Sequence, residues 1–321
     1  MSLSTADATD FGQIEPFRRE LTGYCYRMLA SPFDAEDAVQ ETLLRAWRGL
    51  SRFEDQIGLR PWLYRIATNV CFDMLKGRSR RALPAEVAPV ATGQFVMGTP
   101  RPEATWIAPI SDELVAAPDP DPSEVVVRRE SIRLAFIAAL QHLAPRQRAV
   151  LILRDVLRWQ ASEVAGFLET TETGVNSMLR RARSAIAGAD LDETPASPPE
   201  VEQELLAGYV DAFQRYDVDA LVDLLHEDVL IAMPPFELWL QGVVDARTFL
   251  ASMDDGGHDR VIPIAANGQP AVAVWRPDPT TGTLEAYALM VFEVADDRIA
   301  SIHAFLDPAI FAAFGLSTTA D

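Results

Sequence analysis

Cysteine and histidine are scarce in this chain of 321 residues. The two cysteines, Cys25 and Cys71, lie among apolar residues of predicted helices, where a thiol is more often a small core side chain than half of a disulfide. The four histidines show no spacing typical of metal ligands: His142, His226, His258 and His303. We therefore expect no metal, no cofactor and a reducing, cytoplasmic location.

Long apolar runs are absent as well. A membrane-spanning helix needs about 20 consecutive apolar residues, and no stretch of this sequence comes near that length. Residues 1–13 are polar and acidic, unlike an export signal. The sequence thus predicts a protein without a membrane partner.

Basic residues are few in the second part of the chain. Residues 188–321 hold 24 acidic and 5 basic residues, which accounts for the whole net charge of −19, whereas residues 1–187 hold 23 of each. An acidic surface repels nucleic acid, so a nucleic-acid-binding site is expected only in the first part.

The sequence of residues 10–83 predicts a small bundle of three or more helices. The second helix begins with acidic residues, which a helix N-terminus stabilises, and the third begins near Pro61, which the first turn of a helix tolerates. Apolar residues recur at helical spacing along the third helix: Trp62, Ile66, Val70 and Met74. That helix ends in a cluster of cations: Lys76, Arg78, Arg80 and Arg81. On composition alone, this is equally a helical hairpin with a solvated basic end.

Residues 124–187 predict a second all-helical domain. Its last two helices, 160–168 and 174–186, are separated by a short turn in which Thr171 or Thr173 can cap the second helix. This is the layout of a helix-turn-helix, whose second helix enters the major groove of DNA. The outward side of that helix and its cap carry groups that read bases or hold phosphates: Thr173, Asn176, Ser177, Arg180, Arg181 and Arg183. The spacing alone fits an ordinary helical hairpin just as well.

Two segments have the composition of linkers. Residues 84–123 are acidic and rich in proline, and residues 188–200 are rich in Asp, Pro, Ser and Ala, so both are expected to bury little surface. Trp106 and Ile107 form an apolar island in the first of them. An isolated tryptophan usually packs on a partner surface, so we predict that these two residues make an interdomain contact.

Residues 201–316 differ in character from the rest. Helices are predicted at 201–216, 218–225 and 243–253. Strands are predicted at 229–233, 271–276, 284–294 and 299–306. Helices followed by antiparallel strands indicate an α+β domain with its helices on one face of a curved sheet.

Two stretches in the first part resemble the bacterial extracytoplasmic-function sigma factors. DAEDAVQETLLRAW with RPWLYRIATNVCFDMLKGRSRR resembles their second domain, and LAPRQRAVLILRDVLRWQASEVAGFLETTETGVNSMLRRARSAI resembles their fourth. The resemblance implies binding to core RNA polymerase through Asp37, Gln40 and Glu41. It implies binding to promoter DNA through two further groups. One surrounds the third helix: Trp62, Asn69, Lys76, Arg78, Arg80 and Arg81. The other is the outward side of the helix-turn-helix described above.

The third part is similar to the SnoaL-like polyketide cyclases, through element order and the segment LLAGYVDAFQRYDVDALVDLLHEDVLIAMPP. That similarity implies a cone-shaped fold with a pocket for a small-molecule ligand. The residues expected to line it are Tyr209, Phe213, Met233, Trp239, Trp275, His303 and Asp307. For any one of them, ordinary core packing is the competing interpretation.

The sequence therefore predicts a multidomain protein with two all-α sigma domains and a C-terminal α+β domain. We expect a sigma factor that directs promoter recognition and transcription initiation, not an enzyme, with its activity regulated by the fused acidic domain. Two alternatives stay open. One is a SnoaL-like enzyme that uses His303 and Asp307 for acid–base chemistry; the other is a ligand-sensing DNA-binding regulator that never meets polymerase.

Overall fold

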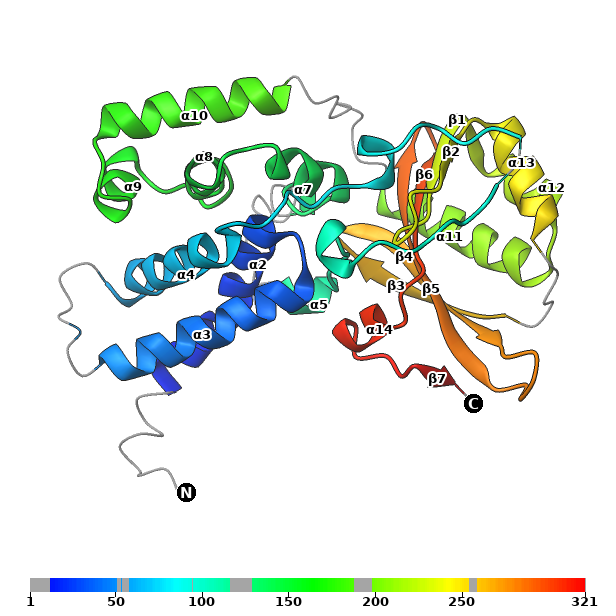
Figure 1. The fold of residues 1–321 in the computed structure, drawn as a ribbon, viewed down its shortest axis with the longest axis horizontal. Coiled ribbons are helices and arrows are strands. Elements are labelled where there is room, and N and C mark those ends of the chain that lie inside the picture. The colour runs from blue at the N-terminus through cyan, green and yellow to red at the C-terminus, as the bar shows by residue number, and fades with distance from the viewer. Residues whose placement is uncertain are drawn as a thin grey trace. The chain divides into compact units, whose positions relative to one another are not determined.

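The computed structural model forms two compact units (Figure 1). It describes residues 12–50, 53, 58–93, 95–115, 129–187, 198–253 and 259–320. The first unit comprises Met1–Arg80 with Asp112–Leu191, and the second comprises Arg81–Ser111 with Asp192–Asp321. The segment 81–111 therefore belongs to the C-terminal unit, whereas the sequence predicts a free linker over 84–123.

The first half of the first unit is a helical bundle. A short 3₁₀ turn (Glu15–Phe17) leads into α2 (Arg18–Leu29), which is followed by α3 (Pro32–Leu50) and α4 (Leu59–Leu75). α2 ends at Ala30, whose φ of 57° lies in the left-handed region and reverses the chain. The three predicted helices are thus present.

The buried side of α4 differs from the predicted stripe. The buried residues are Leu63, Tyr64, Ala67, Thr68, Val70 and Cys71. Trp62, Ile66 and Met74 are only half-buried. The inner side includes the polar Thr68, whose hydroxyl lies 2.6 Å from the Tyr24 hydroxyl and donates to the Tyr64 carbonyl at 2.8 Å. Hydrophobic periodicity does not detect a side of this kind.

The second half of the first unit is also helical. Its elements are α5 (Asp112–Val115), α7 (Leu134–Gln141), α8 (Pro145–Leu151) with a π turn (Ile152–Val156), α9 (Ala161–Phe167) and α10 (Glu172–Ala187). The predicted helix 124–143 begins outside the described residues, and α7 is its later part. The Glu163 carboxylate accepts the Gln160 N–H at 2.6 Å and so caps α9. The Thr171 hydroxyl accepts the Gly174 N–H at 3.0 Å and caps α10.

A buried arginine connects the two halves of this unit. Arg148 of α8 is 4 % exposed, and it donates to the Gln141 side chain at 2.7 Å and to the Met28 carbonyl at the end of α2. Burial lowers the pKa of Arg148 to about 10. At neutral pH its charge is therefore retained, and its two Nη groups donate to carbonyl oxygens rather than to a carboxylate.

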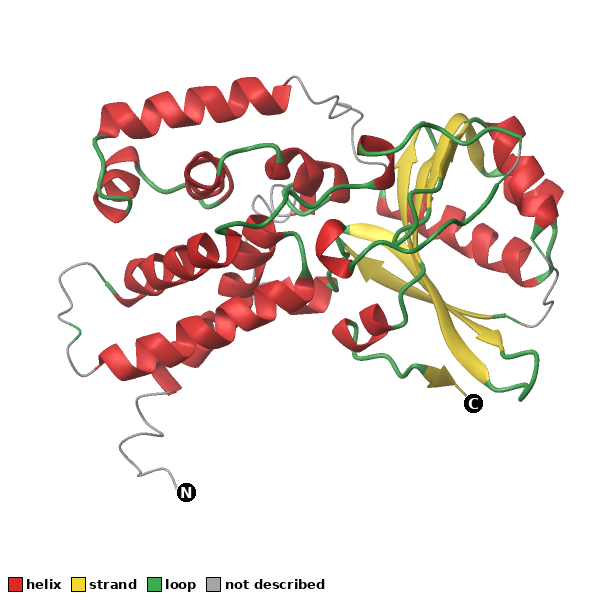
Figure 2. Cartoon of the chain, in the orientation of Figure 1, coloured by secondary structure: helices red, strands yellow, loops and turns green. Residues whose placement is uncertain are grey.

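The described part of the second unit contains a seven-stranded sheet (Figure 2). The strands are β1 (Leu225–Ala232), β2 (Trp239–Gln241), β3 (Arg260–Ala266), β4 (Gln269–Pro277), β5 (Leu284–Ala295), β6 (Arg298–Phe305) and β7 (Thr319–Ala320). Their order is β2-β1-β6-β5-β4-β3, and β7 pairs with β5. The β1–β6 pair is parallel and the other pairs are antiparallel.

Tight turns set the register of the long strands. Asn267 and Gly268 both have positive φ, 56° and 65°, and join β3 to β4. Asp296 and Asp297, with φ of 49° and 56°, join β5 to β6. Two consecutive residues at positive φ match the twist of a β-hairpin, and Asn-Gly is the strongest sequence signal for such a turn.

Helices cover one face of the sheet. They are α11 (Pro199–Gln214), α12 (Val218–Asp223) and α13 (Val243–Ser252), and the main apolar core lies between them and the sheet. The short α14 (Ala309–Ala313) follows β6 and packs on the other face, where Phe311 meets Trp275 edge-to-face with ring centroids 5.1 Å apart. The predicted α+β architecture is confirmed.

Among the residues that the structure describes, no helix has both the length and the apolar composition that crossing a bilayer demands.

Candidate functional site

The polar side of α3 presents the residues predicted to bind polymerase. Asp37 and Gln40 are exposed, and Glu41 is half-exposed and paired with Arg45 at 2.6 Å. Leu44, on the same side, keeps 44 % of its surface exposed. The opposite side of α3 is buried in the bundle. The helix therefore offers a charged surface with one apolar residue, a composition that suits a protein–protein interface.

The cations after α4 are held by neighbouring acids. Lys76 pairs with Asp73 at 2.7 Å, and Arg78 pairs with Asp34 at 2.8 Å. These side chains and that of Arg80 remain exposed. Exposed ion pairs contribute little to stability, about 0–1 kcal/mol, so a phosphate can replace the carboxylate at small cost.

Arg81 differs from the rest of this cluster. It is 6 % exposed, and its guanidinium donates to the carbonyls of Glu103 and Trp106 at 2.8 and 2.7 Å. These bonds stabilise the path of the 81–111 segment. The prediction that Arg81 contacts DNA does not fit this burial, and we exclude it from the candidate DNA contacts.

The aromatic residues of α4 occupy two environments. Trp62 is half-buried and packs on Phe53 at a ring separation of 4.8 Å, whereas Asn69 is exposed. Tyr64 is fully buried between Tyr24 and Trp159, at 5.1 and 5.2 Å. Tyr64 is therefore a core residue, whereas Trp62 and Asn69, among the described residues of α4, stay accessible to an unpaired base.

The helix-turn-helix exposes the predicted side of α10. Val175, Leu179 and Ala182 are buried, while most of the predicted contact residues are exposed: Thr173, Asn176, Arg180, Arg181 and Arg183. Ser177 is half-buried. The turn is held by Arg146, which donates to the Leu168 carbonyl at 2.5 Å. This bond joins the start of α8 to the turn after α9, and the polar side of α10 faces away from the buried residues of the helix.

Arg183 is not equivalent to Arg180 and Arg181. It forms a two-pronged ion pair with Asp155, at 2.6 and 2.8 Å, and the hydrogen bond to that carboxylate raises its pKa. A DNA contact by Arg183 would have to replace this pair or share it. Thr173, for its part, is not the cap of α10, since Thr171 takes that role.

The segment 81–111 is attached to the C-terminal sheet by hydrogen bonds. The Trp106 indole donates to the Pro235 carbonyl at 3.0 Å, and the Trp239 indole donates to the Ala88 carbonyl at 2.8 Å. Further along, the side-chain oxygen of Asn267 accepts the Ile110 N–H at 2.9 Å. Trp106 is 3 % exposed and Ile107 is fully buried. The apolar island is thus part of the second unit's structure.

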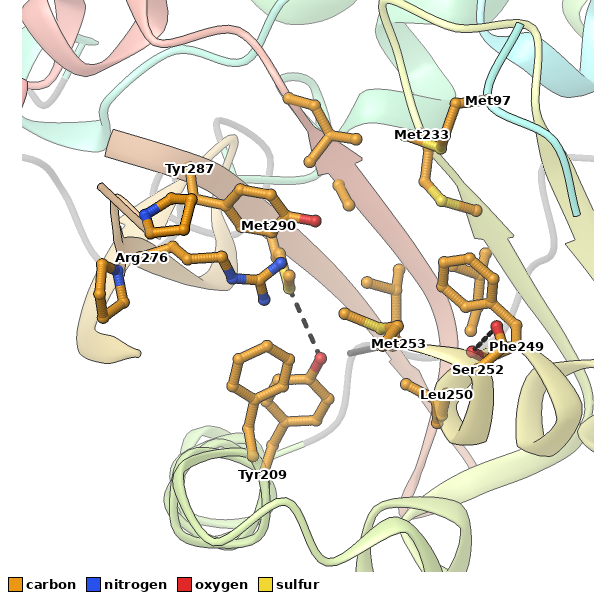
Figure 3. Close-up of a pocket in the computed structure, with 17 residues that line it drawn as sticks. Met97, Tyr209, Met233, Phe249, Leu250, Ser252, Met253, Arg276, Tyr287 and Met290 are labelled. Carbon is orange, nitrogen blue, oxygen red and sulfur yellow. Dashed lines mark hydrogen bonds between the residues drawn. The ribbon is translucent and has the colours of Figure 1, made fainter. Parts of the chain in front are cut away.

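A cavity of about 460 Å³ lies within the second unit (Figure 3). Its lining is mainly apolar and comes from α11, α13, the sheet and the 81–111 segment. Four of the eight methionines of the chain contribute to it: Met97, Met233, Met253 and Met290. Met97 belongs to the segment predicted as a linker, and nearby Phe95 packs edge-to-face on Phe249 of α13 at 5.6 Å.

One cation lies in this lining. Arg276 is bound to Asp259 through Nε–Oδ1 at 3.0 Å and Nη2–Oδ2 at 2.6 Å, and its guanidinium stacks on the Tyr287 ring at 3.7 Å. Burial alone would lower the pKa of Arg276, but the hydrogen bond to Asp259 raises it above its usual value. The Tyr209 hydroxyl donates to the Met290 sulfur at 3.5 Å, and burial raises its pKa. The lining thus combines an ordered cation with polarisable apolar groups.

Three predicted pocket residues line this cavity, and four do not. Tyr209, Phe213 and Met233 lie in the lining. The residues found elsewhere are Trp239, Trp275, His303 and Asp307. Trp239 binds the 81–111 segment, Trp275 donates to the Ser317 carbonyl at 2.9 Å, and the Asp307 carboxylate accepts the Ala309 N–H at 3.0 Å.

His303 is excluded from the cavity by strand alternation. Its neighbours Ile302 and Ala304 face the cavity, so His303 faces the other side of the sheet. Burial lowers the pKa of His303 to about 4, so the ring is neutral near pH 7. His303 and Asp307 therefore do not form the acid–base pair of the enzyme alternative.

Arg276, Tyr287 and Met97 line the cavity although they are not among the residues predicted to do so. Arg276 and Tyr287 face each other across β4 and β5, which the predicted hairpin between these strands could have indicated. No sequence signal indicates that Met97 lines a cavity, because the composition of its segment is typical of a solvent-exposed linker. Within the described part of the chain, no cluster of histidine, cysteine, aspartate and glutamate could hold a metal ion.

Comparison with protein families assigns the three parts of the chain. Residues 13–81 match Sigma-70 region 2, and residues 133–186 match Sigma-70 region 4. Residues 206–302 match the SnoaL-like domain. The chain is 45 % identical over 312 residues to the ECF RNA polymerase sigma factor SigG of Mycobacterium tuberculosis (strain H37Rv), covering 94 % of this chain and 82 % of that one. The chain belongs to the ECF RNA polymerase sigma factors.

One further relative, SigJ, resembles this sigma factor in sequence and in fold. The M. tuberculosis (strain H37Rv) ECF sigma factor SigJ is 29 % identical over 220 residues, which cover 68 % of this chain and 63 % of SigJ. The crystal structure of the M. tuberculosis SigJ superposes with a TM-score of 0.61 at 21 % identity, over 94 % of this chain and 98 % of that one. That likeness shows a shared fold, in which helical sigma domains precede a SnoaL-like domain.

Proposed function

We propose that this sigma factor binds core RNA polymerase through the exposed side of α3, with Asp37, Gln40 and Glu41 as contacts and Leu44 beside them. One observation carries the proposal: α3 buries one side in the bundle and leaves these residues accessible on the other. Acidic and amide groups suit a basic partner surface, and electrostatic complementarity orients such encounters.

Promoter DNA is proposed to contact two further surfaces. Arg180 and Arg181 of α10, with Asn176, would enter the major groove of the upstream element, since guanidinium and amide groups read guanine and adenine edges. The exposed cations after α4 would follow the backbone of the downstream element, near Trp62 and Asn69: Lys76, Arg78 and Arg80. Both surfaces belong to residues 1–187, which hold 23 acidic and 23 basic residues, and not to the acidic residues 188–321. The protein would act in the cytoplasm, where polymerase works.

The C-terminal unit is proposed to regulate rather than to catalyse. It binds the segment that joins the two sigma domains, so it can restrict how these domains are placed on polymerase and promoter. The described lining of its cavity includes no histidine and no carboxylate residue. That composition favours binding over acid–base chemistry.

Binding to purified core polymerase, measured by co-elution, tests the proposal. Asp37→Arg with Glu41→Arg should weaken binding at least tenfold, because the variant loses attraction and gains repulsion. A control with the same charge change, Glu204→Arg with Glu285→Arg, alters exposed residues of the C-terminal unit and should bind normally. Equal binding by both double variants would remove α3 from the interface.

A further inference from the structure

The cavity of the C-terminal unit carries an inference about its ligand, which rests on the regulatory function proposed above. We propose that it binds a neutral, mainly apolar molecule that carries an oxygen acceptor, and that Met97 forms one wall, so that the bound molecule holds the 81–111 segment in place.

The size and lining of the cavity determine the ligand class. A volume of about 460 Å³ falls within the range of small-molecule sites, roughly 300–1,000 Å³. Apolar side chains dominate the lining, and four of them are methionines, whose flexible, polarisable thioethers adapt to ligands of different outline. The cavity is therefore suited to a family of apolar molecules rather than to one rigid shape.

Arg276 determines the charge and the polar group of the ligand. Its charge is already balanced by Asp259, which engages Nε and Nη2. A carboxylate ligand would add an uncompensated negative charge to an apolar cavity, which is costly. No described residue accepts a hydrogen bond from Nη1, and stacking on Tyr287 fixes the plane in which it donates. A neutral carbonyl or hydroxyl oxygen satisfies this donor.

Met97 connects the cavity to the linker segment. It lies with Met233 on the side of the cavity opposite Arg276 and Tyr287 (Figure 3). Its neighbour Phe95 packs on Phe249, which also lines the cavity. A ligand that contacts Met97 binds the docked form more tightly than the released form, so docking and ligand binding must favour each other to the same extent.

The probe for this test is Nile red, a neutral apolar dye with a carbonyl oxygen, added to the full chain and followed by fluorescence. We expect saturable one-to-one binding, at least tenfold tighter than that of the anionic dye anilinonaphthalene sulfonate. Ala304→Leu, which fills part of the cavity, and Met97→Ala, which removes a wall, should each weaken binding about tenfold. Val96→Ala, at a neighbouring position that is 75 % exposed, should bind normally.

Coupling is measured by cleavage after Glu103 with a glutamate-specific protease. Nile red at 100 times its wild-type dissociation constant should slow this cleavage about tenfold in the wild type, the factor expected for loss of the Met97 wall, and much less in Met97→Ala. If Ala304→Leu fails to fold by circular dichroism, Ser252→Phe at the exposed edge of the cavity replaces it. The absence of saturable binding, equal affinity for the anionic dye, binding unaffected by the cavity variants, or unchanged cleavage would each overturn the inference. Polymerase binding by the same preparations without dye tests the proposed function separately.

Discussion

Removing the indole of Trp106 should release the 81–111 segment from the C-terminal unit. Trp106 is 3 % exposed, its N–H donates to the Pro235 carbonyl, and its own carbonyl accepts from Arg81. Replacing a buried tryptophan by alanine costs about 3–5 kcal/mol, because apolar contacts are lost and a cavity remains. We expect Trp106→Ala to destabilise docking of the segment by about 3 kcal/mol.

Proteolysis measures this change directly. When opening is fast relative to cleavage, the cleavage rate follows the population of the open form. Since about 1.4 kcal/mol corresponds to a factor of ten, a loss of 3 kcal/mol predicts cleavage after Glu86 and Glu103 roughly a hundredfold faster. The fragments are identified by mass after digestion with a glutamate-specific protease.

Two matched variants separate the contributions. Trp106→Phe keeps most of the apolar surface and removes the hydrogen bond to Pro235, so it should cost about 1–2 kcal/mol and accelerate cleavage five- to thirtyfold. Val96→Ala alters an exposed residue of the same segment and should be cut at the wild-type rate. If Trp106→Ala is also cut at the wild-type rate, the indole does not hold the segment and the reasoning is wrong.

Two further predictions concern DNA recognition and pH. Arg180→Ala should weaken use of the upstream promoter element: a base contact would cost about 1–3 kcal/mol at one position, whereas a phosphate contact would weaken binding uniformly and reduce the salt slope by about one. No change in either footprinting or salt dependence would mean that α10 does not read DNA, and Arg215→Ala in the C-terminal unit is the control. For His303, the folded pKa of about 4 lies below the unfolded value of about 6.5, so the unfolded chain binds the proton first and stability falls as pH decreases through this interval. Between pH 7 and pH 5, the free energy of unfolding of the wild type should fall by about 2 kcal/mol more than that of His303→Leu, as measured by thermal unfolding. Parallel plots of this free energy against pH for the two proteins would contradict the assignment.

The helix-turn-helix was predictable because its signals are local. The alternation of Val175, Leu179 and Ala182 with polar residues sets the buried side of α10, and the threonine cap sets its start. The buried side of α4 was not predictable in the same way. There the inner side carries the polar Thr68, whose hydroxyl is hydrogen-bonded to the distant Tyr24 hydroxyl and donates to the Tyr64 carbonyl one turn earlier. The pattern of apolar residues therefore indicates a neighbouring side of the helix.

In the C-terminal unit, one unpredicted element has a recognisable sequence signal and another has none. β3 was missed because Pro263 interrupts its pattern, although β3 is an edge strand, where proline is tolerated, and Asn267-Gly268 marks the turn that follows. The ordered path of residues 81–111 has no comparable signal. Its buried residues contact residues more than a hundred positions away, such as Pro235. Its composition alone is typical of solvent-exposed chain, so it does not predict these contacts.

Covalent attachment explains how contacts this small can control a sigma factor. A separate inhibitor must reach a sufficient concentration, whereas a domain joined by a short chain acts at an effective concentration in the millimolar range. A docking free energy of a few kilocalories per mole is then enough to keep the 81–111 segment bound most of the time. Docking of this strength is also weak enough for polymerase to compete with it. The acidic charge of residues 188–321 adds a second effect, because it repels DNA from the C-terminal unit. Affinity for polymerase should therefore rise when docking is weakened, if the docked segment holds the sigma domains in an arrangement that polymerase must change. It should fall if the docked arrangement is the one that polymerase binds, and titrating Trp106→Ala against core polymerase distinguishes the two.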